Sequence, residues 1–227
     1  MSSQLNWKVT AVLASPLAGE PPQLDAILEY EMAQRHGKAM TIDRGRPCPP
    51  IGSIHLPLLR GRIGPVDGLP RCSSPILPAC QMEHEFFAKR LSVENASMLR
   101  EDQRTVVSVG SNWTKSYRLP LLIRRIDRVC WFVGGSRRRS LRSLLKTVKA
   151  LGHKRSQGFG RVAEWIVEPE ENDLSWFAPS PEGPILMRIM PLCDDLPANL
   201  QGFRRSFGGV VAPYWHPDRQ MEIAVPC

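Results

Sequence analysis

The segment from Leu141 to Val167 reads LRSLLKTVKALGHKRSQGFGRVAEWIV, and it decides our prediction of the fold. Five apolar residues recur at the spacing of one helical face: Leu141, Leu144, Leu145, Val148 and Leu151. We therefore expect an amphipathic helix, with Gly152 in the left-handed position that often ends a helix. A glycine-bounded loop follows, and residues 161–168 should then leave it as a strand.

Basic residues are concentrated in and around this segment. From 136 to 163 there is no Asp or Glu, and nine residues are basic: Arg137, Arg138, Arg139, Arg142, Lys146, Lys149, Lys154, Arg155 and Arg161. The whole chain carries a formal net charge of +8, so this one segment exceeds the excess of the full chain. Such a charge fits nucleic acid, an anionic membrane surface or an acidic partner, and a polyanion is the first partner to consider.

The loop offers a dense set of donors and one aromatic ring: Gly152, His153, Lys154, Arg155, Ser156, Gln157, Gly158, Phe159, Gly160 and Arg161. Dinucleotide-binding folds place their glycines between a strand and the N-terminus of a helix, whereas here the expected order is helix, glycines, strand. Charged donors can follow an RNA backbone while Phe159 stacks on a base. Alternatively, the loop is a solvated basic connector whose glycines only make the turn.

A second glycine pair, Gly134–Gly135, comes directly before the expected helix. The backbone amides there could bind an anion, with Arg137, Arg138 and Arg139 close by. Equally, Ser136 could cap a helix whose basic first turn is simply exposed. Arginines in a first turn oppose the helix dipole, at a small cost that an anion would offset.

The rest of the chain predicts an α+β fold. Residues 7–14 should form a strand and residues 24–35 a helix, followed by an irregular Pro-, Gly- and Arg-rich insertion at about 43–80, with short extended pieces at 51–59 and 75–77. Residues 128–133 should form a central strand, and 184–190 another strand. With β-α at the front and β-α-loop-β at the back, the layout is of the ferredoxin-like kind.

Residues 82–90, 106–109 and 119–124 look extended, which predicts a hairpin with a long tip or a projecting loop at about 91–118. A possible stacking group ends this loop: Trp113, Lys115, Tyr117 and Arg118. These aromatic rings could equally pack the loop onto its own sheet. The same two interpretations apply to Phe203–Arg205 and Tyr214–His216, where core packing is favoured.

The sequence offers little for catalysis. His153, beside Lys154 and Arg155, could act as a general base in metal-free RNA cleavage, although no second acid or base is placed near it. We find no nucleotide-triphosphate, hydrolase or zinc motif and expect no cofactor or metal. The six scattered cysteines are expected to be free thiols in a reducing compartment. No signal peptide or membrane-length apolar run is evident, so a cytoplasmic protein without membrane contact is expected.

Three segments together resemble a known family: VTAVLASPLAGEPPQLDAILEYEMAQRHG at 9–37, EFFAKRLSVENASMLREDQRTVVSVGSNWTKSYRLPL at 85–121, and GHKRSQGFGRV at 152–162. The last is similar to the glycine-rich loop of the RAMP superfamily of CRISPR-associated proteins. The first two look like the type IV Cas-five-like subunit, the third Csf protein.

The resemblance implies a single RRM-like domain over 1–227 with a projecting thumb within 91–118. It also implies binding of the 5′ handle of the CRISPR RNA and capping of a filament of Cas-seven-like backbone subunits. Contact with a large Cas-eight-like subunit and with target DNA near the protospacer-adjacent motif would follow. In that family this subunit is usually structural, but some relatives in other types cut RNA. A metal-independent CRISPR RNA endonuclease and a generic basic RNA-binding protein therefore stay open as alternatives.

Overall fold

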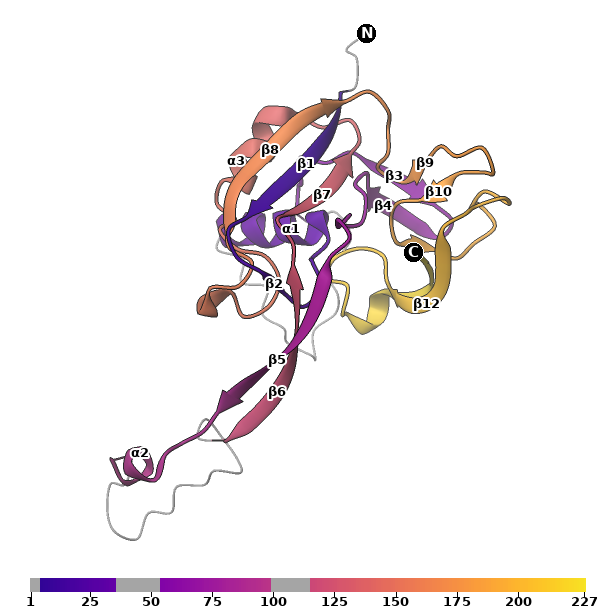
Figure 1. Ribbon diagram of the computed structural model, residues 1–227. Helices are drawn as coiled ribbons and strands as arrows, with labels where there is room; N and C mark the ends of the chain where they lie inside the picture. Colours follow the sequence, from indigo (N-terminus) through magenta and orange to yellow (C-terminus); the bar gives the residue numbers. More distant parts are fainter. Residues whose placement is uncertain (1–4, 36–53, 99–114) are drawn as a thin grey trace.

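The computed structural model describes residues 5–35, 54–98 and 115–227. At its centre is an antiparallel sheet in the order β7-β1-β8, made by β7 (Arg128–Val133), β1 (Asn6–Leu13) and β8 (Val162–Glu170) (Figure 1). All three strands are confirmed near their predicted positions.

An irregular segment extends this sheet. Its Ser73 and Ile76 amides donate to the carbonyls of Phe132 and Cys130, both at 2.8 Å, so that residues 72–76 run antiparallel along the outer edge of β7. As predicted, β7 is therefore flanked on both sides.

Two helices, α1 (Leu24–Arg35) and α3 (Arg138–Leu145), contact each other behind this sheet (Figure 1). Their apolar residues and those of the sheet form one core, in which Val9, Trp131 and Leu141 are fully buried. Helix α1 has the predicted bounds. This packing fixes where the basic residues of α3 lie, because its apolar stripe faces inward and leaves the other face in solvent.

Helix α3 is shorter than predicted. It ends at Leu145, yet all five residues of its apolar stripe are buried. The chain beyond Leu145 pairs with the start of β8 instead, since Lys149 O accepts from Val162 N at 2.9 Å. The predicted caps were wrong as well: Ser136 Oγ donates to Pro57 O, Arg137 holds the N-cap position, and Lys146 rather than Gly152 is the C-cap.

A two-stranded arm extends away from the rest of the molecule (Figure 1). It is formed by β5 (Gln81–Lys89) and β6 (Tyr117–Arg125), with β2 (Leu17–Ala18) paired to the base of β6 and α2 (Val93–Met98) beyond the end of β5. The predicted hairpin is confirmed. The expected extended piece at 106–109 lies outside the described residues.

The insertion predicted to be irregular contains a regular hairpin, β3 (Arg60–Ile63) and β4 (Val66–Pro70). The extended piece expected at 51–59 was wrong where it can be compared, and the one expected at 75–77 is borne out only at Ile76. Residues 54–59 form no strand, and in 75–77 only Ile76 makes an isolated bridge. The hairpin escapes prediction because Gly61, Gly64 and Gly68 interrupt any apolar alternation.

The C-terminal residues build a second core, which includes Leu69 of the β3–β4 hairpin. Its elements are η3 (Pro217–Arg219), β9 (Phe177–Ala178), β10 (Ile185–Leu186), β11 (Met190–Pro191), β12 (Phe203–Gly209) and β13 (Gln220–Pro226). Strands β11, β13 and β12 pair in that order. The strand expected at 184–190 was wrong, because β10 and β11 are separate two-residue strands with Arg188 between them.

Candidate nucleic-acid interface

The loop between α3 and β8 is held against the turn that follows β1. His153 N donates to Ala18 O and Gly160 N to Pro16 O, each at 2.8 Å, while Leu151 N donates to Gly160 O at 2.8 Å. Ser15 Oγ donates to Gly158 O at 2.7 Å. The backbone is therefore fixed by the body of the protein, and the side chains of the loop are free to serve another purpose.

Two of the three loop glycines are needed for packing. A Cβ on Gly160 would lie 2.0 Å from Leu151 O, and one on Gly152 would lie 2.6 Å from Ala18 O; both glycines have positive φ. Gly158 also has a positive φ but open space around it. The glycines thus make the close approach and the turn, as the connector interpretation expects, and the donors are the side chains around them.

Most of those side chains reach solvent. His153, Arg155, Ser156, Gln157 and Arg161 are exposed, whereas Lys154 and Phe159 are half-buried. Lys154 has a left-handed backbone (φ 54°) at the start of η2 (Arg155–Gln157). Phe159, expected as the stacking platform, is therefore only partly available to a base.

The basic residues of α3 continue this surface. All of them are exposed: Arg137, Arg138, Arg139, Arg142, Lys146 and Lys149. A shallow depression of about 520 Å³ runs between Arg138, Arg142 and Lys146. Among contacts within the described residues, only Arg138 of these six is tethered, with Nε donating to Val167 O at 3.1 Å and the guanidinium 5.7 Å from the Trp7 ring. We use the name basic surface for these six residues together with Lys154, Arg155 and Arg161 of the loop.

None of the nine basic residues in this surface pairs with a carboxylate of residues 5–35, 54–98 or 115–227. Arginines elsewhere behave differently, since five of them form ion pairs: Arg71, Arg124, Arg125, Arg128 and Arg188. The positive charge of the basic surface is thus uncompensated within the part of the chain that the structure describes.

The glycine pair before α3 does not form an open anion site. Gly134 N donates to Arg71 O at 2.9 Å and Gly135 N to Asn6 Oδ1 at 3.3 Å. A Cβ on Gly134 would also meet the Asp173 carboxylate at 2.9 Å. Both amides are therefore satisfied by the protein itself.

The arm meets the loop through aromatic rings. Lys154 Nζ lies 3.9 Å from the centroid of Phe87, whose ring is 5.9 Å from that of Tyr117. Arg118 stacks at 3.9 Å on Phe86, which is 56% exposed. Tyr117 thus packs on its own hairpin, as one of the two interpretations expected.

Of the other residues in that predicted group, Lys115 is exposed and Trp113 lies outside the described residues. Sequence reasoning missed Phe86 and Phe87. The signal available in the sequence was that both phenylalanines lie in a predicted strand, where side chains alternate between two faces, and have charged neighbours.

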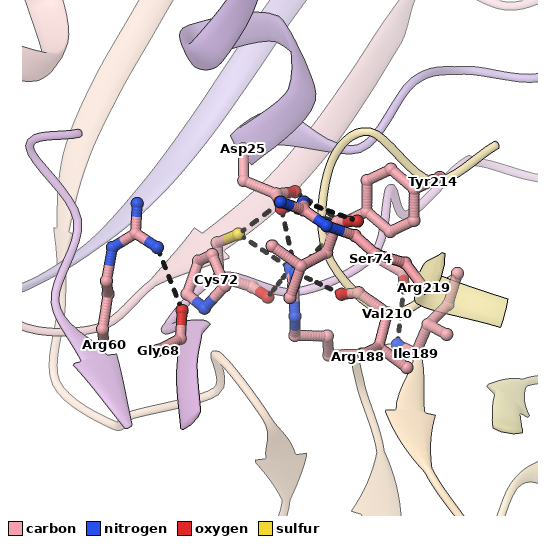
Figure 2. A network of polar contacts seen from close by, with 12 residues as sticks. Asp25, Arg60, Gly68, Cys72, Ser74, Arg188, Ile189, Val210, Tyr214 and Arg219 are labelled. Atoms are coloured by element: carbon pink, nitrogen blue, oxygen red, sulfur yellow. Dashed lines mark hydrogen bonds and ion pairs between the residues drawn. The ribbon is translucent and has the colours of Figure 1, made fainter. Parts of the chain in front are cut away.

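Between the two cores lies a largely buried polar network (Figure 2). Arg188, fully buried, donates from Nη2 to Asp25 Oδ2 at 3.0 Å and from Nη1 to Cys72 O at 3.0 Å. Tyr214 OH donates to Asp25 at 2.8 Å. Although burial acts against it, the charge of Asp25 keeps the pKa of Arg188 well above its ordinary value, while burial raises the pKa of Cys72 to about 12.

Because Asp25, Cys72 and Arg188 are fully buried, the network is a structural link between α1 and the C-terminal core. No local sequence pattern indicates this network, because its members are separated by as many as 189 residues. Core packing, the favoured interpretation of the tail aromatics, is confirmed for His216, which is 8% exposed, and in part for Tyr214, which is half-buried and bonds to Asp25. Phe203 also packs on the second core, but Trp215 is 52% exposed.

The five described cysteines are free thiols, as expected: Cys72, Cys80, Cys130, Cys193 and Cys227. The described residues contain no group of three or more His, Cys, Asp or Glu side chains placed to hold a metal ion. Among them, no helix has both the length and the apolar character needed to cross a bilayer.

Compared with known proteins, the chain matches no family model and no curated protein.

Proposed function

We propose that this protein is a non-catalytic RNA-binding subunit of a type IV CRISPR effector complex, and that its basic surface holds the 5′ handle of the CRISPR RNA. The observation that carries the proposal is the row of nine uncompensated basic side chains along α3 and the loop. Leaving so many like charges together destabilises a folded chain, and a polyanion removes that cost by releasing its counterions to bulk solvent.

The sheet supports the family that the sequence resembles. With the 72–76 segment counted as a strand, the order in space is β8, β1, β7 and 72–76, which is the order 4-1-3-2 of a ferredoxin-like unit. Both crossover helices, α1 and α3, lie on one face, as that unit requires. The β5–β6 arm projects from the core, and this supports a thumb because the residues expected to form it, 91–118, run in the sequence from just after β5 into the start of β6.

The partners follow from the same proposal. The subunit would cap a filament of Cas-seven-like backbone subunits in the cytoplasm, beside a large Cas-eight-like subunit and near the protospacer-adjacent motif of the target DNA. Exposed apolar side chains on the arm give such partners a surface: Met82, Phe86 and Leu119.

Salt-dependent binding to repeat RNA tests the RNA-binding role. Replacing Lys154, Arg155 and Arg161 with Ala should weaken binding and reduce the slope of log K against log salt by about 2, since each phosphate contact in a single strand contributes about 0.7. The matched control replaces the ion-paired Arg71, Arg125 and Arg128 and should change the slope much less. Equal slopes for the wild type and the loop variant would contradict the proposal.

Two competing functions are tested with the same protein. Specific cleavage of repeat RNA in EDTA that is lost in His153→Ala would identify a metal-independent endonuclease instead of a structural subunit. The RNA that co-purifies with the protein tests the generic alternative. A discrete RNA of uniform length with repeat sequence supports the proposal, and a broad mixture of cellular RNA supports a generic RNA-binding protein.

A further inference from the structure

A cavity of about 240 Å³ opens between α1, the turn after β2 and the beginning of the loop. Its deep walls are apolar, because Ile27, Val148 and Leu151 all line it and are less than 8% exposed. Pockets for drug-sized ligands hold roughly 300–1,000 Å³, so this one suits a smaller, flat, partly apolar group.

Two carboxylates line the cavity beside the basic surface. Glu31 is one, and its Oε2 accepts from Thr147 Oγ1 at 2.6 Å; Glu20 is the other and pairs with Arg124. Since a carboxylate has about four acceptor positions, each keeps capacity for a further donor. Two negative groups disfavour a phosphate in the cavity but favour a neutral group that donates hydrogen bonds.

The mouth of the cavity has a stacking geometry. Tyr30 is 44% exposed, and the Arg155 guanidinium lies 5.8 Å from the centroid of its ring. Aromatic rings and guanidinium planes are the groups on which unstacked RNA bases rest. The nearby Lys154 and Arg161 of the loop can meanwhile hold the phosphates on either side of such a base.

We infer that this cavity takes one unstacked guanine base of the bound RNA, an inference that rests on the proposed function. Guanine presents two adjacent donors on its Watson–Crick edge, N1–H and the N2 amino group, and two adjacent donors match a carboxylate in a bidentate manner. Adenine and cytosine each offer a single amino group, and uracil offers a single ring N–H. Glu31, the carboxylate that is not ion-paired with Arg124, would thus select guanine, and Tyr30 would hold its face.

The probe is a short oligouridine in which one guanosine is moved stepwise along the chain. One position should bind at least about tenfold more tightly than oligouridine alone, a gain of about 1.4 kcal/mol, because hydrogen bonds to a charged group are stronger than neutral ones. Inosine, which lacks the N2 amino group, should lose most of that gain at the same position. 7-Deazaguanosine should keep it, since its Watson–Crick edge is intact.

Two variants locate the effect. Ala26→Phe fills the cavity from α1, and Glu31→Gln removes the charge while keeping the shape; either should abolish the preference for guanosine. Glu171→Gln, an exposed carboxylate away from the cavity, is the matched control and should retain it. Thermal unfolding identifies a variant that is merely misfolded.

Several results would overturn the inference. These are equal binding at every guanosine position, a preference that survives both variants, or stronger competition by lysine amide than by guanosine. The last would make the cavity a site for a basic side chain of a partner protein. Oligouridine binding and its salt dependence report separately on the proposed function, so a failure of base selection leaves that function standing and is recognised as such.

Discussion

Arg188 and Arg139 show two opposite uses of the same side chain. Arg188 is fully buried and is satisfied by Asp25, Cys72 and Tyr214. Arg139 is exposed on the first turn of α3, with no carboxylate partner among the described residues. The first arginine stabilises the fold, and the second adds charge that the fold does not need. This contrast separates residues that hold the protein together from residues that are available to a ligand.

The contrast predicts the largest loss of stability at Arg188. Arg188→Ala should lower the free energy of unfolding by about 3–5 kcal/mol, because it leaves the buried Asp25 carboxylate without its cation. Urea unfolding followed by fluorescence measures this loss, and Arg142→Ala, on the basic surface, should change stability by less than about 0.5 kcal/mol. A double variant, Arg188→Met with Asp25→Leu, should recover most of the stability. The contrast fails if Arg188→Ala is as mild as Arg142→Ala.

The glycine loop allows a similar comparison between packing and exposure. Gly160→Ala should cost about 2–3 kcal/mol, since its φ is +61° and the new Cβ would lie 2.0 Å from Leu151 O. Gly158→Ala is the matched control: its φ of +93° is also strained, but no atom lies within 4 Å of the new Cβ. Thermal unfolding should therefore show a clearly lower Tm for Gly160→Ala. Equal losses would mean that only backbone strain matters in this loop.

Glu29 makes the stability dependent on pH. Burial first, and the charge of Asp25 next, raise the pKa of Glu29 to about 7 in the folded protein, against Arg219 and Arg60, whose charges lower it. The folded state then holds this proton more tightly than the unfolded state, so the contribution is complete below about pH 4.5 and is lost as the pH rises through 7. At about 1.4 kcal/mol for each pH unit between 4.5 and 7, the full loss would be roughly 3 kcal/mol, and solvent screening lowers it to roughly 2 kcal/mol.

Glu29→Gln, which cannot ionise, should remove this decline. The measurement is the free energy of unfolding of both proteins between pH 5 and about 8. Glu164→Gln, an exposed carboxylate on β8, serves as the control and should follow the wild type. Identical pH profiles for the wild type and Glu29→Gln would show that the Glu29 carboxyl titrates normally.

The contrast between residues that stabilise the fold and residues that are available to a ligand also explains what could be predicted from the sequence. The stripe from Leu141 to Leu151 correctly marked buried residues, because burial follows apolar spacing. It did not mark the end of α3, since the hydrogen bonds of Lys149 and Leu151 are made with residues 160–162, later in the chain. A local sequence pattern does not show which distant residues will become hydrogen-bond partners. Asp25 and Arg188 are 163 residues apart, and the contact of Lys154 with Phe87 also depends on two distant segments meeting.

The charge of the basic surface was predictable for the opposite reason. A run of basic residues is recognised from its own sequence, because no Asp or Glu occurs from 136 to 163. No distant partner has to be known. The loop was therefore identified before its geometry was known, although its contact with the arm was not.

The smallest expected effect is the most direct test of the contrast. Arg139 lies in the first turn of α3, where a positive charge opposes the helix dipole and a negative charge favours it. Arg139→Glu should therefore raise the free energy of unfolding by about 0.3–1 kcal/mol. The same change should weaken RNA binding, because it replaces a phosphate contact with a repulsive charge.

A change at this one residue is thus expected to raise stability and weaken RNA binding. A change at a residue needed for the fold would lower stability instead. Arg139→Gln is the intermediate control and should fall between the wild type and Arg139→Glu in both measurements. Urea unfolding and fluorescence anisotropy with repeat RNA provide the two values on the same samples. If Arg139→Glu lowered stability and left RNA binding unchanged, Arg139 would belong with Arg188 among the residues that serve the fold, and the RNA-binding surface would have to exclude the first turn of α3.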